Sequence, residues 1–95
     1  MKYRSRSDII GLILESANGG ATKTKIMYKS YLSFAQLRDY LAMLTGQGLV
    51  EHDEIRHIFK TTTKGLQVLQ LQNQINEEFD AIDDDRKRRV AVELH

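Results

Sequence analysis

Residues 22–49 read TKTKIMYKSYLSFAQLRDYLAMLTGQGL, and this stretch decides the fold of the 95-residue chain. Thr22 is a favourable N-cap for a short helix from Lys23 to about Tyr28. Ser33 is the N-cap of a longer helix, and Gln36, three residues on, completes an S-x-x-Q capping box. The few residues between the two helices are enough only for a tight turn. The stretch therefore predicts a helix-turn-helix.

The longer helix carries an apolar stripe at helical spacing, which predicts the face that packs on the core. This stripe consists of Phe34, Leu37, Tyr40, Leu41 and Leu44. The helix is expected to stop at Gly46 and Gly48. Its opposite face is expected to carry Ala35, Asp39, Ala42 and Met43, with Gln36 and Arg38 at the margins.

Regular elements are also predicted on both sides of this stretch. An earlier helix from Asp8 to Ala17, with Ser7 as N-cap, ends at the pair Gly19-Gly20. After the longer helix, two short β-prone runs, 49–52 and 55–61, flank Asp53-Glu54. They predict a hairpin, and because Asp-Glu is a poor two-residue turn, its loop should be longer than two residues.

A final helix, capped by Thr62 or Thr63, is expected to run to about Val92. The order of elements predicts a mostly α fold with a small β-hairpin, namely a winged helix-turn-helix followed by a long C-terminal helix. We expect residues 1–64 to form the winged-helix domain and residues 65–95 a dimerisation helix. A plain three-helix bundle is the alternative, and the hairpin argues against it.

Composition excludes several classes of protein. The chain has no cysteine, which rules out disulfides and thiolate metal sites. It has no run of 18 apolar residues, and no apolar segment of signal-peptide type follows the basic start. Residues 1–64 hold 10 Lys and Arg against 6 Asp and Glu, whereas residues 65–95 hold 4 against 7. The N-terminal two-thirds is therefore the part suited to a polyanionic partner.

The sequence also resembles a known family, the archaeal small winged-helix DNA-binding proteins of about ten kilodaltons. The resemblance rests on Thr24 to Tyr28, Leu32 to Phe34, Gln36-Leu37, Tyr40-Leu41, Leu44 and Gly48 to Val50, and on the segments 5–10 and 63–66. It implies archaeal origin, binding of double-stranded DNA, and a homodimer formed by a C-terminal coiled coil. It also favours an antiparallel arrangement of that coiled coil, which the apolar pattern by itself leaves open.

Candidate DNA contacts gather around the helix-turn-helix. The third helix of a winged helix usually enters the major groove. Gln36 could read adenine there, unless capping occupies it, and Arg38 could bind guanine or phosphate. Asp39 would repel phosphate, although it could accept a hydrogen bond from cytosine. The small side chain of Ala35 permits close approach to the bases. Phosphate contacts are expected from Lys23, Lys25, Lys29, Ser30, Tyr31 and the helix start at Ser33.

The hairpin and the N-terminus offer weaker candidates. Arg56 could enter a minor groove, although the acidic pair Asp53-Glu54 works against it. A further alternative is that His52 and His57 face each other as metal ligands, but two histidines without cysteine supply fewer ligands than a zinc site uses. Lys2, Arg4 and Arg6 could form a basic arm or a loose terminus.

The long helix carries apolar residues that its own domain cannot cover. The predicted dimer interface consists of Val68, Leu71, Ile75, Phe79 and Ile82. Positions 68, 75, 82 and 89 follow a heptad-like spacing, although the last is Arg89. Leu66 and Leu69 are expected to pack on the domain instead. The run Asp83 to Arg89 is interpreted as i, i+4 ion pairs, with a basic patch on flanking DNA as the first alternative. A metal site on the three carboxylates is the second, and the different faces to which consecutive helical residues point argue against it.

These observations predict a dimeric DNA-binding protein of the cytoplasm, associated with the nucleoid, that acts as a transcription regulator or a chromatin protein. They leave open whether binding is sequence-specific or sequence-tolerant. The alternative is a winged-helix module that binds proteins and not nucleic acid. No nucleophile–base pair or phosphate-binding glycine loop is visible, so we expect no enzyme activity, cofactor, metal or small-molecule substrate.

Overall fold

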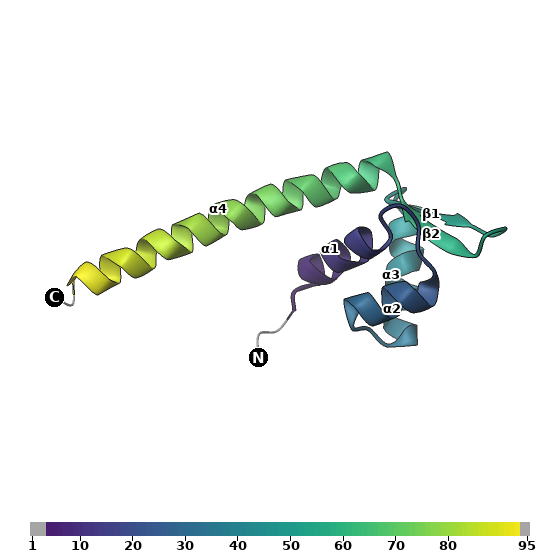
Figure 1. Cartoon of the computed structure of the whole chain (residues 1–95), viewed down its shortest axis with the longest axis horizontal. Coiled ribbons are helices and arrows are strands. Elements are labelled where there is room, and N and C mark those ends of the chain that lie inside the picture. Colours follow the sequence, from purple (N-terminus) through teal and green to yellow (C-terminus); the bar gives the residue numbers. More distant parts are fainter. Residues whose placement is uncertain (1–3, 94–95) are drawn as a thin grey trace.

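The computed structural model describes the backbone of residues 4–93 and the side chains of residues 4–82. Three helices come first: α1 (Arg6–Ser16), α2 (Lys23–Ser30) and α3 (Phe34–Gly46). The hairpin β1 (Val50–Asp53) and β2 (Ile58–Thr61) follows, and then the long helix α4 (Thr63–Glu93). Figure 1 shows α1 to α3 packed into a small body, with the hairpin projecting from one side and α4 extending from the other. This is the predicted fold class, a winged helix-turn-helix with a long C-terminal helix.

The body is held together by one apolar core. Ile13 and Leu14 of α1, Ile26 of α2, and Leu37 of α3 are completely buried. Leu32, in the α2–α3 turn, is also buried and anchors the turn. Full burial of such side chains stabilises a domain by roughly 1.5–3 kcal/mol each. The three helices therefore form one unit that fixes how α3 is presented.

The hairpin, called the wing from here on, is joined to the body rather than hanging free. Its strands are antiparallel, with Val50 opposite Thr61 and Asp53 opposite Ile58. Phe59 forms a further β-bridge with Ala21, just before α2. The predicted loop longer than two residues is confirmed, since four residues, 54–57, connect the strands.

The start of α4 is packed tightly against the body. The hydroxyl of Thr62 accepts a hydrogen bond from the amide of Gly65 at 3.0 Å, which caps the helix. A β-carbon on Gly65 would clash with the carbonyl oxygen of Leu49, so only glycine allows this approach. Leu69 is 9% exposed and belongs to the core. Beyond it, α4 leaves the body and makes the molecule 63 Å long.

The helix α1 begins earlier than predicted. Its N-cap is Ser5 and not Ser7, and the Ser5 amide and hydroxyl form a reciprocal capping box with Asp8. The carbonyl oxygen of Ser7 instead accepts a hydrogen bond from the side-chain amide of Gln72 on α4. The expected cap at Ser7 was wrong because Ser7 lies inside the first turn of the helix.

Two further expectations about packing were wrong. Phe34 is 57% exposed, because as the first residue of α3 it lies beyond the edge of the core that Leu37 covers. Leu66 is 38% exposed, since the first turns of α4 direct Leu69 and Val68 to the body. The helix α2 also runs two residues beyond Tyr28, to Ser30.

In the part of the chain that the structure describes, no helix is long and apolar enough to cross a membrane. The side chains of Asp83 to Arg89, for which ion pairs were expected, and Lys2 of the expected basic arm lie outside the described residues.

Candidate nucleic-acid interface

The outer face of α3 is the centre of the candidate interface. The predicted capping box is confirmed: the Ser33 hydroxyl accepts from the Gln36 amide at 3.2 Å, and Gln36 Oε1 accepts from the Ser33 amide at 3.0 Å. Leu37, Leu41 and Leu44 hold the inner face of α3 against the core. The residues left exposed on the opposite face include Ala35, Asp39, Ala42 and Gly46, which are small or acidic, with Arg38 beside them.

Capping limits what Gln36 can recognise. Reading adenine bidentately needs both the oxygen and the nitrogen of a side-chain amide. The oxygen of Gln36 is already bonded to the Ser33 backbone. Gln36 therefore acts in the structure as a cap, and only its NH₂ group is left to face a ligand.

A shallow cavity of about 370 Å³ separates α3 from the wing and brings together two cationic side chains and a histidine. Lys23 of α2, Arg38 of α3 and His52 of β1 line it, together with Phe59 of β2. The His52 ring stacks on Phe59, with centroids 4.2 Å apart. The alternative that His52 and His57 face each other was wrong, because Phe59 is the residue paired with His52 and His57 lies in the loop. No sequence pattern indicated this cavity, which exists because the wing folds back beside α3.

Arg38 has an acidic neighbour. Its Nε lies 3.6 Å from Oδ1 of Asp39, and both side chains are mostly exposed. Surface ion pairs of this kind hold residues only weakly, by about 0–1 kcal/mol, so Arg38 can exchange Asp39 for a phosphate or a base at little cost. Asp39 stays at the centre of the outer face, where it opposes the approach of a phosphate.

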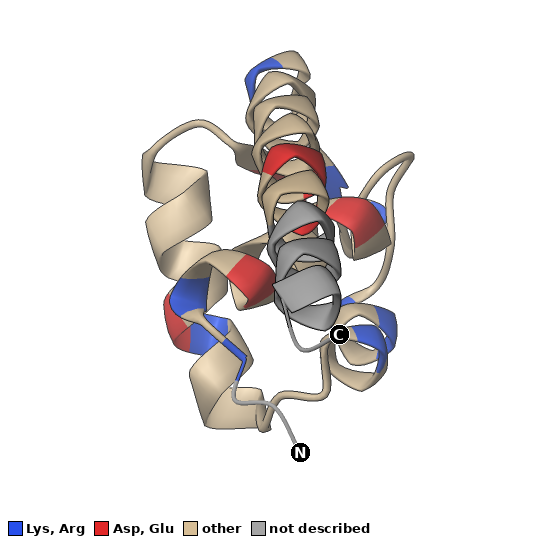
Figure 2. Ribbon diagram, turned by 90° about the vertical axis from the view of Figure 1, so that its left-hand side faces the viewer, with Lys and Arg blue, Asp and Glu red and all other residues tan. Residues whose placement is uncertain are grey.

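The lysines of α2 flank this face. Lys25 and Lys29 are exposed, and Lys23 is half-buried with its ammonium 4.1 Å from the centroid of the Phe34 ring. In Figure 2, the ribbon of α2 is marked by Lys and by no acidic residue. The sequence from Ser16 to Arg38 contains three Lys, one Arg and neither Asp nor Glu. This makes the α2–α3 region the most consistently basic part of the described surface.

Of the two phosphate contacts expected at the end of α2, the structure excludes Ser30 and leaves Tyr31 exposed. Ser30 is completely buried, and its hydroxyl donates to the carbonyl of Ile26. Ser30 therefore cannot reach a phosphate, and the expectation that it does was wrong because α2 continues through it. Tyr31 is 80% exposed, in the left-handed conformation that ends α2.

The arginines near the N-terminus do not form a free arm. Arg4 donates to the carbonyl oxygens of Ser30 and Tyr31, so it caps the end of α2. Arg6 is the first residue of α1. The expected basic arm was therefore wrong for both residues.

The wing tip is organised by Asp53. Its Oδ1 accepts hydrogen bonds from the amides of Ile55 and Arg56 at 3.0 and 3.1 Å. Its Oδ2 lies 3.8 Å from Nε of Arg56. One of the two acidic residues at the tip is thus engaged within the loop, and Arg56 is exposed beside it.

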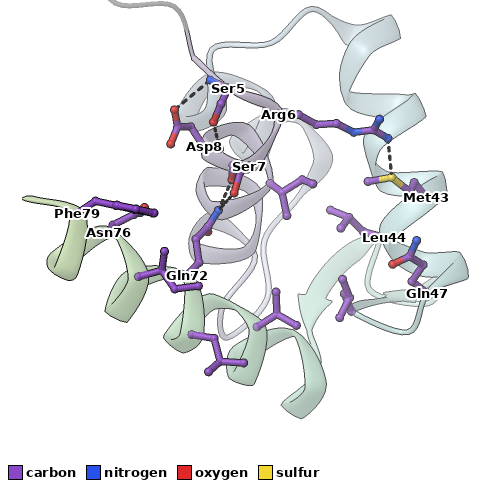
Figure 3. A pocket seen from close by; sticks show the side chains of 15 residues that line it. Ser5, Arg6, Ser7, Asp8, Met43, Leu44, Gln47, Gln72, Asn76 and Phe79 are labelled. Carbon is purple, nitrogen blue, oxygen red and sulfur yellow. Dashed lines mark hydrogen bonds between the residues drawn. The ribbon is translucent and has the colours of Figure 1, made fainter.

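The far side of the body carries an apolar groove that continues along α4. A cavity of about 660 Å³ lies between α1, α3 and α4. Figure 3 shows its lining, where Met43 and Leu44 of α3 lie across from Gln72, Asn76 and Phe79 of α4. Among the predicted interface residues, Val68 is half-buried against its own core. The other four are more than half exposed: Leu71, Ile75, Phe79 and Ile82.

With this geometry established, comparison with known proteins identifies the class. A family model described as winged helix-turn-helix matches residues 3–79, most of the chain. The chain therefore belongs to the winged helix-turn-helix family. No curated protein matches its sequence.

Among solved structures, the chain is similar to Sso10a-2, a DNA-binding protein from Sulfolobus solfataricus. The TM-score is 0.80 at 16% sequence identity, and the match covers 94% of this chain and 96% of Sso10a-2. At this identity the likeness establishes the fold, which extends through the long C-terminal helix. The fold expected from the family resemblance is thereby confirmed.

Proposed function

We propose that the chain binds double-stranded DNA and catalyses no reaction, with α3 in the major groove and the lysines of α2 on the flanking phosphates. The observation that carries this proposal is the acid-free run from Ser16 to Arg38, which the fold places beside the exposed face of α3. Lys23, Lys25, Lys29 and Arg38 supply the charge that attracts phosphate. The family and the DNA-binding structural neighbour support the same function.

The binding we propose is sequence-tolerant. Discrimination between bases requires side chains that present donors and acceptors to base edges. The outer face of α3 offers Ala35, Ala42 and Gly46, and Gln36 is engaged as a cap. Arg38 is the one strong base-reading candidate on α3, so phosphate contacts, including one from Tyr31, carry most of the affinity. Arg56 at the wing tip is the candidate for the minor groove.

We further propose that the protein is a homodimer joined through α4. Leu71, Ile75, Phe79 and Ile82 recur along the helix and are 53–65% exposed in the single chain. Burying apolar surface stabilises an interface by about 25 cal/mol per Å², and a partner helix with the same row supplies the matching surface. On this proposal, the chain divides into a winged-helix part, residues 1–64, and a dimerisation part, residues 65–95, with Leu69 and Val68 joining the two.

An antiparallel arrangement of the two helices fits the shape of the molecule best. The winged-helix body sits at the N-terminal end of α4, so a parallel pair would crowd two bodies together at one end. In an antiparallel pair, the C-terminal half of the partner helix lies along the groove beside Leu71 and Ile75. Because the chain has no cysteine, this can be tested with a single Leu71→Cys variant. A parallel pair forms a disulfide between the two introduced thiols under mild oxidation, and an antiparallel pair does not.

A sequence-tolerant dimer with two DNA-binding faces suits an architectural role on chromatin better than the regulation of a single promoter. On this view, the protein is nucleoid-associated and cytoplasmic, as the resemblance to archaeal DNA-binding proteins implies. In the antiparallel dimer a DNA-binding face lies at each end of the paired α4 helices, so the dimer can hold two segments of duplex.

The test of DNA binding is a titration of a labelled duplex of random sequence at several salt concentrations. Log affinity should fall linearly with log salt, because each lysine that neutralises a phosphate releases a counterion. Duplexes of different sequence should bind within a small factor of each other. If duplex is not bound at micromolar protein in low salt, DNA binding is disproved.

A protein-binding module is the second candidate function, and the wing favours it. Between Val50 and Thr61 three acidic residues outnumber two basic ones, and Asp39 sits at the centre of the α3 face. Absence of duplex binding by the folded protein would support this alternative.

A further inference from the structure

Three exposed aromatic rings surround the turn between α2 and α3. Tyr28 is 72% exposed, Tyr31 80% and Phe34 57%. They fall within seven residues of the chain, and none of them belongs to the apolar core. The other strongly exposed apolar side chains of the described residues lie on α4, apart from Ile55 on the wing. We call this group, together with Lys23, Lys25 and Lys29, the α2–α3 aromatic surface.

Cations lie over two of these rings. The Lys23 ammonium is 4.1 Å from the Phe34 centroid, and the Arg4 guanidinium carbon is 5.8 Å from the Tyr31 centroid. A cation on one face of a ring is attracted by its π electrons and leaves the other face available. Lys25 and Lys29 are exposed on α2, the helix that carries Tyr28. The surface thus combines exposed apolar rings with nearby positive charge.

Contacts to duplex phosphates do not account for these rings. A tyrosine hydroxyl can donate to a phosphate, but Phe34 has no hydroxyl and gains nothing from such a contact. Exposing three large rings close together is unfavourable in water and marks a binding surface. Charge selects the partner, because no Asp or Glu occurs between Ser16 and Arg38, and a polyanion with flat apolar groups complements such a surface.

We propose that the α2–α3 aromatic surface also binds single-stranded nucleic acid, with unpaired bases stacked on Tyr31, Phe34 and Tyr28 and the strand's phosphates on the lysines. Aromatic rings that alternate with cations are how proteins bind single strands without reading sequence. Successive rings are three residues apart, so their Cα atoms are at most about 11 Å apart, within the reach of neighbouring nucleotides. The proposal deepens the proposed function and rests on it, since the same lysines serve the duplex.

The experiment compares two labelled strands of equal length by fluorescence anisotropy, an oligothymidylate and an abasic strand. Both carry the same phosphates, but only the first has bases to stack. We expect the full-length protein to bind the oligothymidylate about tenfold more tightly than the abasic strand. Equal affinity for the two strands, or no binding of either, overturns the proposal. Duplex binding is measured in parallel, so that failure of the stacking surface is distinguished from failure of DNA binding altogether.

Variants of Tyr31 separate stacking from a hydroxyl contact. Tyr31→Phe keeps the ring and should bind the oligothymidylate as the parent does, whereas Tyr31→Ala should lose about tenfold. Phe34→Ala should lose a similar factor, and Phe34→Tyr should retain affinity. Both positions are exposed in the fold, and circular dichroism verifies that each variant is folded. If Tyr31→Phe is as weak as Tyr31→Ala, the hydroxyl and not the ring makes the contact, and the stacking proposal is wrong.

Discussion

The hydroxyl of Thr61, the last residue of β2, donates a hydrogen bond of 2.7 Å to the carbonyl oxygen of Leu14 in α1. Both residues are buried, with Thr61 3% exposed and Leu14 fully covered. This contact joins the base of the wing to the last turn of α1. The position of the wing relative to the helices therefore depends on a polar contact inside the body.

Replacing Thr61 with Val should destabilise the protein by about 1–3 kcal/mol, because the Leu14 carbonyl then loses its side-chain donor in a buried place. Thr61→Ser keeps the hydroxyl and should lose less. Urea unfolding followed by circular dichroism measures both. Equal loss for Val and Ser would show that the methyl group, and not the hydrogen bond, stabilises the site.

Gly65→Ala should destabilise by about 1–3 kcal/mol through overpacking, since its β-carbon would clash with the Leu49 carbonyl oxygen and lie 2.7 Å from the Thr61 methyl group. Gly46→Ala is the matched control, because nothing lies within 4 Å of the β-carbon there. Thermal melts of the two variants should move apart, with the control unchanged or slightly more stable. Equal melting temperatures would contradict the close packing of α4 on the body.

Lys25→Ala and Lys29→Ala should each make the fall of log duplex affinity with log salt less steep by about one, because each removes one phosphate contact. Lys64→Ala is the control for loss of a cation elsewhere, since its ammonium donates to the Gln47 carbonyl just beyond the C-terminal end of α3. Salt titrations of the three variants provide the test. If the salt dependence of Lys64→Ala is less steep than that of the other two variants, the DNA lies on a different face.

Ile75→Asn combined with Phe79→Ser should halve the molecular mass in solution, because it breaks the exposed apolar row of α4 in its middle. Light scattering coupled to size exclusion measures the mass. Ile55→Ser is the matched control, since Ile55 is 92% exposed but isolated on the wing. A parent protein already at the mass of one chain would refute the dimer.

The capping box of α1 should make stability depend on acidity. Hydrogen bonds from the backbone amide and the hydroxyl of Ser5 hold the pKa of Asp8 below its usual value. A carboxyl whose pKa is lowered by folding adds stability above its unfolded pKa, about 3.9, and loses it as pH falls through the folded value. Asp8→Asn should therefore melt lower than the parent near neutral pH, with the gap closing in strong acid. A gap that does not change with pH would contradict the sign.

Most of the fold could be predicted because local signals and apolar spacing agree. Thr22 and Ser33 have side chains that cap helices, and Leu37, Leu41 and Leu44 repeat at the period of a buried face. The same reasoning failed for Phe34, because spacing tells which side of a helix a residue is on but not how far the body extends beneath it. It failed for Ser7 because a second serine, Ser5, has Asp8 three residues later and forms the better box.

The candidate interface was predictable only in part. The lysines of α2 follow from sequence, since charged residues on a short helix are seldom buried. The burial of Ser30 depends on α2 continuing past Tyr28, which propensity did not indicate. The cavity lined by Lys23, Arg38 and His52 is built from residues of three elements. A local sequence pattern does not predict contacts between separate elements.

The absence of a side chain at Gly65 affects how far apart the two DNA-binding faces lie in the proposed dimer. Since α4 begins in direct contact with the Leu49 carbonyl, the long helix is held rigidly to the body. A helix of 31 residues is about 46 Å long. In the proposed dimer, α4 therefore holds the α3 helices of the two protomers at a fixed separation. Lengthening α4 by whole turns would reset that gap, and with it the spacing at which two duplex segments are held.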